Sequence, residues 1–269
     1  MDYLNRAQAP FSRELWRLID DAAVAAAREV LTGRRFLQVE GPFGVGLTAI
    51  EVGEDDFCRQ VAEDEAGAVI GQAISVPMLR KSFKLSIRRL EAAESLGQPL
   101  NLAPVEGAAE AVARREEEFV YYGQPDFHLA GLLTAKGRGD VKLHDWTQSA
   151  QAPLDDLIKA ATALDQAGFF GPYALVLEPA LYNALFRRYE GTDMLQLSHI
   201  RRLCERGVLK APIKGGALID PRTGPLLVGQ DLRTGYAGQD GIHYQLFVSE
   251  SLVLRVDEPG AICTLTLGK

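Results

Sequence analysis

The segment from Gly33 to Gly44, which reads GRRFLQVEGPFG, constrains the fold of this chain more than any other. It follows an amphipathic helix that begins after the N-cap residue Ser12 and that Gly33 ends. A short strand over Phe36 to Val39 is predicted next, and Gly41-Pro42 then forms a turn. The segment holds no nucleophile and no phosphate-binding loop, so it predicts a structural corner rather than a reaction centre.

Composition and charge exclude several classes of protein. The 269 residues suffice for one large domain or two modest ones, and a net charge of −7 argues against general affinity for nucleic acid. No secretory signal and no run of about 18 apolar residues is present. The cysteines are few, odd in number and widely spaced, at Cys58, Cys204 and Cys263. They predict reduced thiols, and a soluble cytoplasmic protein without membrane contact is therefore expected.

The stretch from Gly46 to Ser82 predicts a long two-stranded excursion from the body of the protein. Residues 47–52 read as strand, residues 53–56 as a turn, and the strand pattern resumes after residue 73 and continues from Phe83 to Arg89. A two-stranded hairpin alone is only marginally stable in water. We therefore expect it to lie on a neighbouring subunit.

The rest of the chain predicts an α+β arrangement rather than regular βαβ units. A helix of about five turns runs from Pro104 to just before Gly123, and its run Arg114 to Glu118 is assigned mostly to the solvated face. Ser249-Glu250-Ser251 is assigned to a turn. Further helices are predicted over 154–167, 180–189 and 195–206, and further strands over 173–177, 217–219, 226–228, 244–248, 252–256 and 262–267.

Candidate catalytic motifs are weak throughout the chain. Gly44 to Ala49 matches the dinucleotide pattern GxGxxA, but strand and turn residues follow where the fingerprint requires a helix. No GxSxG motif is present. The histidines lack the spacing of a metal site; they are His128, His144, His199 and His243. The sequence predicts no catalytic residue, no metal and no cofactor, and so a protein that is not an enzyme.

Short motifs spread along nearly the whole chain resemble the encapsulin shell proteins, family 1, once catalogued as linocin-type bacteriocins. Each motif is weak alone, but their order and spacing are specific. The matching segments are Trp16 with Ile19-Asp20, Gly33 to Phe36, Val39 to Pro42, Glu117 to Gly123, Gly131 to Leu133, Gly171 to Tyr173, Gly229 to Leu232, Gly235-Tyr236, Ser249-Glu250 and Pro259.

The resemblance implies the fold of tailed-phage major capsid proteins of the Hong Kong phage type. It assigns residues 1–45 to an N-terminal helix and strand of a peripheral domain, and 46–82 to an extended loop. Residues 83–134 and 228–269 complete the peripheral domain, and 135–227 form an axial domain around the fivefold vertices. Subunits would assemble into an icosahedral shell, with sixty copies favoured over 180 or more. The true capsid protein of a prophage is the main alternative, and a hydrolase is a third.

The resemblance also implies two functional regions. A groove on the inner wall would bind a C-terminal targeting peptide of the cargo, and its residues would be Ala23, Ala27, Leu31, Arg34 and Leu232. The small alanines either leave room for the peptide or simply pack internally. A fivefold pore loop would consist of Tyr189, Glu190, Gly191, Thr192, Asp193 and Met194. Its carboxylates would favour the passage of cations.

The expected cargo is a dye-decolorising peroxidase or a ferritin-like iron-storage protein, which would tie the shell to oxidative stress or iron storage. Some family members hold a flavin against a tryptophan on the strand that follows the extended loop. The matching position here is Arg88, so an indole is missing and no flavin is predicted.

Overall fold

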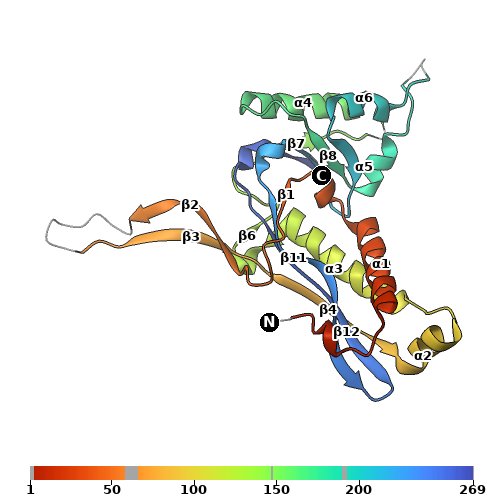
Figure 1. Ribbon diagram of the computed structural model, residues 1–269. Helices are drawn as coiled ribbons and strands as arrows, with labels where there is room; N and C mark the ends of the chain where they lie inside the picture. Colours follow the sequence, from red (N-terminus) through yellow and green to blue (C-terminus); the bar gives the residue numbers. More distant parts are fainter. Residues whose placement is uncertain (1–2, 58–65, 147, 190–192, 269) are drawn as a thin grey trace.

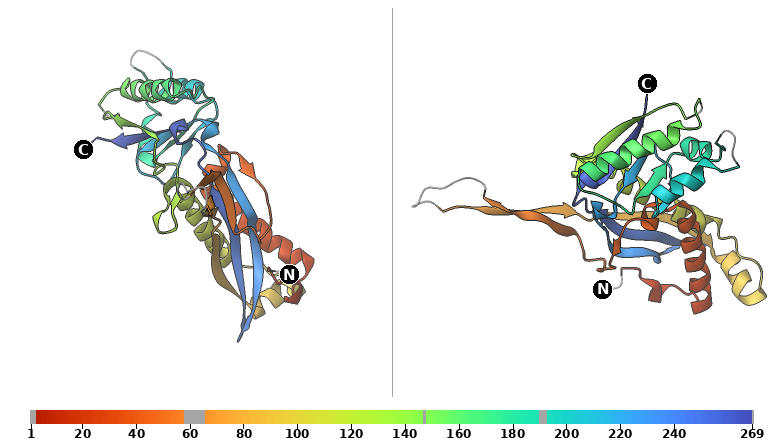
Figure 2. Two further views of the ribbon diagram at one scale, coloured as in Figure 1. Left: turned by 90° about the vertical axis from the view of Figure 1, so that its left-hand side faces the viewer. Right: turned by 90° about the horizontal axis from the view of Figure 1, so that it is seen from above.

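A computed structural model describes residues 3–57, 66–146, 148–189 and 193–268, and it places two β-sheets at the centre of two connected bodies (Figure 1). The larger body contains both the N-terminal helix and the longest strands. The smaller body carries most of the short helices, and a thin hairpin projects from the side of the larger one (Figures 1 and 2). None of the helices in the described part of the chain is long and apolar enough to span a membrane.

The first sheet has the strand order β1-β11-β12-β4. Its strands are β1 (Val39–Glu40), β4 (Met78–Ser86), β11 (Leu226–Asp240) and β12 (His243–Leu254). β1 runs parallel to β11, and the other neighbours are antiparallel. The register between β11 and β12 shifts near Gln230 and Arg233, which is the signature of a β-bulge. The bulge lies where β11 passes the N-terminal helix.

Two helices cover this sheet. α3 (Ala103–Tyr122) packs on β4 and β12, and α1 (Arg13–Val30) packs beside α3 and against β11. The predicted N-cap of α1 is confirmed, because Ser12 Oγ accepts a hydrogen bond from the Leu15 backbone N–H at 3.1 Å. α2 (Ile87–Leu96) and the short β5 (Gly123–Gln124) and β6 (Leu129–Ala130) complete the body. The apolar face of α1 is fully buried and consists of Leu15, Ile19, Ala23 and Ala27.

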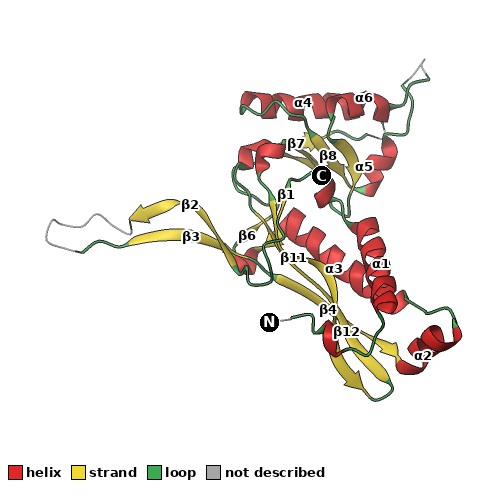
Figure 3. Cartoon of the chain, in the orientation of Figure 1, coloured by secondary structure: helices red, strands yellow, loops and turns green. Residues whose placement is uncertain are grey.

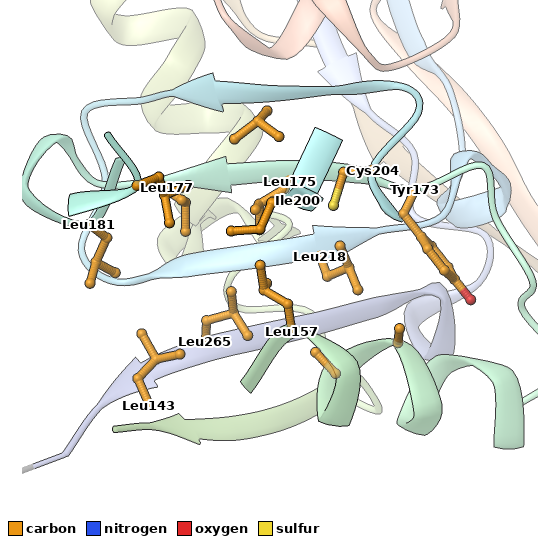
Figure 4. Packing of buried hydrophobic residues seen from close by; sticks show 14 of the residues in the cluster. Leu143, Leu157, Tyr173, Leu175, Leu177, Leu181, Ile200, Cys204, Leu218 and Leu265 are labelled. Atoms are coloured by element: carbon orange, nitrogen blue, oxygen red, sulfur yellow. The ribbon is translucent and has the colours of Figure 1, made fainter. Parts of the chain in front are cut away.

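The second sheet has the order β7-β13-β10-β8-β9 and packs against α4 (Ala152–Gln166), α5 (Pro179–Ala184) and α6 (Gln196–Leu203) (Figure 3). Its strands are β7 (Gly139–Leu143), β8 (Ala174–Leu177), β9 (Gly207–Lys210), β10 (Gly216–Ile219) and β13 (Ile262–Leu267). Alternate residues of a strand face opposite sides. Leu175 and Leu177 therefore point into the core beneath α4 (Figure 4), whereas Ala174 and Val176 join a core shared with β11.

The predicted excursion is a hairpin of β2 (Ala49–Phe57) and β3 (Val69–Ser75), which pair with each other in a two-stranded sheet of their own. Both strands extend well beyond the body (Figures 1 and 2). Ile50 and Ile74 at the base contact the main core, whereas Val69 and Ile70 near the far end are exposed. Residues 66–73 are all exposed, so no other described part of the subunit covers the outer part of β3.

The structure corrects several predicted elements. The strand predicted over Phe36 to Val39 is limited to β1, which follows a 3-10 turn over Gly33–Arg35. Phe36 and Leu37 are both buried, whereas consecutive residues of a strand with one buried face point to opposite sides. Ser249-Glu250-Ser251 is not a turn but lies inside β12. The strand predicted from Phe83 ends at Ser86, where α2 begins. The two helices predicted over 180–189 and 195–206 are the shorter α5 and α6.

The C-terminal residues 228–269, expected in one domain, divide between the two bodies. β11 and β12 belong to the first sheet, whereas β13 pairs with β10 and β7 in the second. Ile262 to Leu265 are all buried, so this strand needs packing layers on both of its faces. A central position in the second sheet provides both layers.

Candidate functional site

A groove of about 500 Å³ runs along the surface between the C-terminal half of α1 and the bulge of β11. A second hollow of about 290 Å³ continues it toward the middle of α1, and the two share Val24, Arg28, Asp231 and Leu232. The groove itself is also lined by Ala27, Leu31, Arg34 and Arg35, and the continuation by Asp20, Ala23, Arg233 and Thr234. All five residues expected in a peptide groove therefore lie around this one surface feature.

The apolar floor of the groove is formed by both elements. Ala27 and Leu31 are buried against Ala113 of α3, with Leu232 packed beside them. Their small or branched side chains let α1 approach α3 closely while one edge still faces the groove. Ala27 therefore packs internally and also lines the groove, so both interpretations of the alanines apply to it.

One wall of the groove is an arginine held by three carboxylates. Arg34 donates to Glu116 through Nε at 2.7 Å and Nη2 at 2.9 Å, a bidentate pair, and Nη2 also donates to Glu250 at 2.9 Å. Nη1 donates to Asp231 at 2.7 Å. The Glu116 and Glu250 side chains are 0% exposed, while Asp231 is 56% exposed at the rim.

The pKa values of Glu250 and Asp231 in this cluster are shifted by burial and by the single cation, Arg34, that the three acids share. Burial and the nearby Glu116 raise the pKa of Glu250 well above its usual value. Glu250 Oε1 is buried close to Glu116 and accepts no hydrogen bond from any described donor. Burial acts to raise the pKa of Asp231, but the hydrogen bond and charge of Arg34 lower it overall. Arg34 is thus the cation on which the whole cluster depends.

A second buried carboxylate fixes the backbone that carries Arg34. Glu117 Oε1 accepts from the backbone N–H groups of Thr32 and Gly33 at 2.9 and 3.0 Å, and Oε2 accepts from Thr32 Oγ1. Thr32 Oγ1 also lies 2.6 Å from the Tyr121 hydroxyl. Burial raises the pKa of Glu117, although these hydrogen bonds act to lower it. The corner predicted from Gly33 onward is therefore anchored to α3.

Sequence reasoning missed the most important partners of this site. Glu116 and Glu117 were assigned to a solvated helix face, yet both are fully buried. Glu116 and Glu250 lie 82 and 216 positions from Arg34, and no local pattern links them. Arg28 could have been found, because it stands three positions before the predicted groove residue Leu31 and so lies on the same side of the helix.

The expected pore loop lies at the far end of the second body. Glu190, Gly191 and Thr192 are outside the described residues, which leaves Tyr189, Asp193 and Met194. A bridge between Arg188 and Leu195 closes the base of the loop. Asp193 is 97% exposed, and Arg188 Nη1 contacts it at 3.0 Å. The loop therefore presents an accessible carboxylate that a neighbouring arginine partly neutralises.

The structure gives no support for a cofactor site at the GxGxxA pattern or at Arg88. β2 begins at Ala49, where a dinucleotide fingerprint requires the start of a helix. Arg88 lies in α2 rather than on the expected strand. Within the described ranges, no three metal-ligating side chains converge.

Comparison with known proteins places these features in context. Residues 1–253 match a family described as "Encapsulating protein for peroxidase". The chain is 35% identical to the type 1 encapsulin shell protein EncA of Myxococcus xanthus, with 98% of this chain and 96% of that protein covered. It is 31% identical to a diheme-cytochrome-encapsulin shell fusion protein of Kuenenia stuttgartiensis, with 94% and 73% covered.

Solved structures share the fold. A virus-like particle from Pyrococcus furiosus matches with a TM-score of 0.73 at 21% identity, over 94% of this chain and 99% of that one. The capsid of the Myoviridae phage XM1 matches with a TM-score of 0.61 at 18% identity, over 87% and 90%. The predicted phage-capsid type of α+β fold is thereby confirmed.

Proposed function

The chain belongs to the encapsulin family of shell proteins, and from this premise we propose that the groove between α1 and β11 docks a C-terminal peptide of a cargo protein. The chain is a structural subunit of a capsid-like cage rather than an enzyme. The observation that carries the docking proposal is the groove itself. An apolar floor of Ala27, Leu31 and Leu232 lies beside the polar wall of Arg34.

The energetics suit a weak, repeated interaction. Fully burying one or two peptide side chains of the size of valine or leucine contributes about 1.5–3 kcal/mol each, which is modest for a single site. An oligomeric cargo that carries several such peptides can engage several grooves of one shell at once, and avidity then retains it. We propose a dye-decolorising peroxidase or a ferritin-like protein as the cargo class. The description of the matching family supports the first of these.

Replacing Leu232 by glutamine is expected to lower cargo loading by about tenfold, because a polar side chain then occupies the apolar floor. The measurement fuses the C-terminal segment of the co-purifying protein to a fluorescent protein and counts fluorescent molecules per shell. Leu96→Gln, an exposed leucine on α2 away from the groove, is the matched control. Equal loading of the Leu232 variant and the parent, with shells intact in both, would exclude the groove as the dock.

We also propose how the subunits meet in the cage. The second body, with β13 included, gathers around the fivefold vertices, and the β2–β3 hairpin overlaps a neighbouring subunit. The exposed outer part of β3 supports this, since a two-stranded hairpin is only marginally stable without a partner. Sixty copies are proposed, with 180 or more as the alternative, and particle diameter decides between them.

The proposed compartment is the cytoplasm. Burial raises the pKa of Cys204 to about 12 and that of Cys263, near Asp140, to about 11, so both free thiols stay protonated at neutral pH. Buried protonated thiols suit a reducing environment. Cys58 lies outside the described residues.

Shells with Glu190→Ala and Asp193→Ala together are expected to admit ferrous iron several-fold more slowly than the parent, because a ring of carboxylates at a pore attracts cations. Stopped-flow oxidation of iron inside loaded shells measures the entry rate. Arg188→Ala, which frees Asp193 from its ion pair, should act in the opposite direction. The exposed Asp126 lies away from this loop, and Asp126→Ala serves as the control. An unchanged rate in the double variant would remove the charge argument.

A further inference from the structure

Three guanidinium groups line the groove and its continuation outside the Arg34 cluster, and the one on Arg233 is close enough to Asp231 to help lower the pKa of that carboxyl. They belong to Arg28, Arg35 and Arg233, and within the described part of the chain none of them forms an ion pair. Arg35 donates through Nη2 to the backbone carbonyl of Arg28 at 3.0 Å, which places the Arg35 guanidinium against the last turn of α1. All three are exposed, so their charges face the open groove.

The acids that line the same surface are already engaged. Asp231 binds Arg34 at 2.7 Å. Asp20 accepts from Arg6 Nη2 at 2.7 Å and from Thr234 Oγ1 at 2.5 Å. Arg34 in turn is matched by Glu116 and Glu250. Asp20 is balanced by Arg6, and the four guanidinium groups of the groove outnumber the three carboxylates around Arg34 by one, so the groove carries a small positive excess although the whole chain carries −7.

The floor beneath these arginines argues for a peptide as the occupant. Val24, Ala27 and Leu232 offer apolar surface between the cations. A nucleic-acid backbone gains little from apolar surface, and its affinity depends on the number of phosphates neutralised. A short peptide with both apolar and acidic side chains matches both properties of the groove.

We propose that the groove selects a cargo segment whose apolar side chains flank at least one carboxylate, held by Arg28 and Arg35 or by Arg233. This inference rests on the docking function proposed above and specifies the chemistry of its ligand. The carboxylate belongs either to an aspartate or glutamate side chain or to the C-terminus of the cargo. Complementary charge at a half-exposed rim adds specificity and raises the rate of association more than it adds affinity.

A charge-swap experiment on intact shells tests the proposal. The probe is a fluorescent protein that carries the C-terminal segment of the protein that co-purifies with the shell. Arg28→Glu is expected to reduce its loading about fivefold, and Arg35→Gln by a smaller factor. Arg17→Glu is the matched control, since it makes the same charge change three turns earlier on α1 and outside the groove. Replacing an acidic residue of the segment by lysine should restore loading into Arg28→Glu shells.

Two further arms identify the carboxylate and the class of ligand. If adding a Gly-Ser-Gly tail abolishes loading and neutralising the acidic side chains does not, the C-terminal carboxylate is the group bound. If Arg28→Glu lowers the nucleic acid that co-purifies with shells but leaves segment loading unchanged, the proposal is overturned in favour of nucleic acid.

The outcome also separates this inference from the docking function. Loading that falls with Leu232→Gln but is the same in Arg28→Glu and parent shells would overturn the charge inference and leave the dock intact. Loading that responds to neither variant would mean that the peptide binds elsewhere.

Discussion

Replacing Arg34 by alanine is expected to destabilise the subunit by about 3–5 kcal/mol, the cost of removing one partner from a buried ion pair. The change leaves Glu116 and Glu250 buried without a cation. Guanidinium unfolding of shells, with parent and variant at the same protein concentration, measures the loss, because assembly makes apparent stability depend on concentration. A midpoint within error of the parent would show that the three-carboxylate cluster contributes nothing to the fold.

Two matched variants separate the buried partners from the exposed one. Asp231→Asn removes a rim carboxylate that is more than half exposed, and its effect should stay below about 1 kcal/mol. Glu250→Gln keeps the shape of the side chain and removes its charge. Because burial raises the pKa of Glu250 and so disfavours its charged form, this change should cost less than Arg34→Ala.

The pH dependence of Glu250→Gln has a definite sign. The folded state raises the pKa of Glu250 above its unfolded value of about 4.3, so folding takes up protons at this site. The contribution of Glu250 to the free energy of unfolding is fully present below the unfolded pKa. It is lost as the pH rises toward the pKa of Glu250 in the folded state. Glutamine cannot ionise, and the variant should therefore gain stability relative to the parent as pH increases above about 4.3. A relative gain on acidification instead would mean that the folded state lowers the pKa of Glu250.

Shortening the β2–β3 hairpin is expected to abolish closed shells while leaving a folded subunit. Val52 and Gln72 are cross-strand partners, so Asn-Gly can replace residues 53–71 as a two-residue hairpin turn. The base stays intact, because Val76 N–H donates to the Thr48 carbonyl at 2.8 Å and Ile50 and Ile74 keep their core contacts. The proposed overlap with a neighbour is then lost, and an obligate interface of the usual size is removed.

Negative-stain electron microscopy with light scattering is the measurement, and the diameter of parent particles also gives the copy number. Circular dichroism and a cooperative thermal transition serve as the control for folding. A second variant, Val69→Lys with Ile70→Lys, keeps the hairpin but places charges on its exposed apolar end. It should weaken assembly to a lesser extent. Closed shells from the shortened chain, of the same size as the parent's, would exclude the hairpin as an assembly element.

Local sequence patterns predicted the elements that depend on short-range chemistry. Ser12 caps α1 as expected, because an N-cap bond involves only its own first turn. The hairpin could be predicted because two segments with a strand pattern are separated by turn residues. The family, and with it the capsid-type fold, was identified from the order of short motifs between Trp16 and Pro259. The two alternatives of a prophage capsid and a hydrolase are disfavoured by relatives named as encapsulin shell proteins.

Tertiary structure alone decided the chemistry of the groove. By itself, the sequence determined the first helix and the hairpin, and the five proposed groove residues came from the family resemblance. It could not show that Glu116 is buried, because a charged run on a helix is assigned to solvent unless its counterion is known. That counterion, Arg34, lies 82 positions away, and the bulge of β11 brings Asp231 to it. The charge left unpaired on Arg28 and Arg35 emerges only after those pairings are known, since net charge along a surface depends on which groups meet in space.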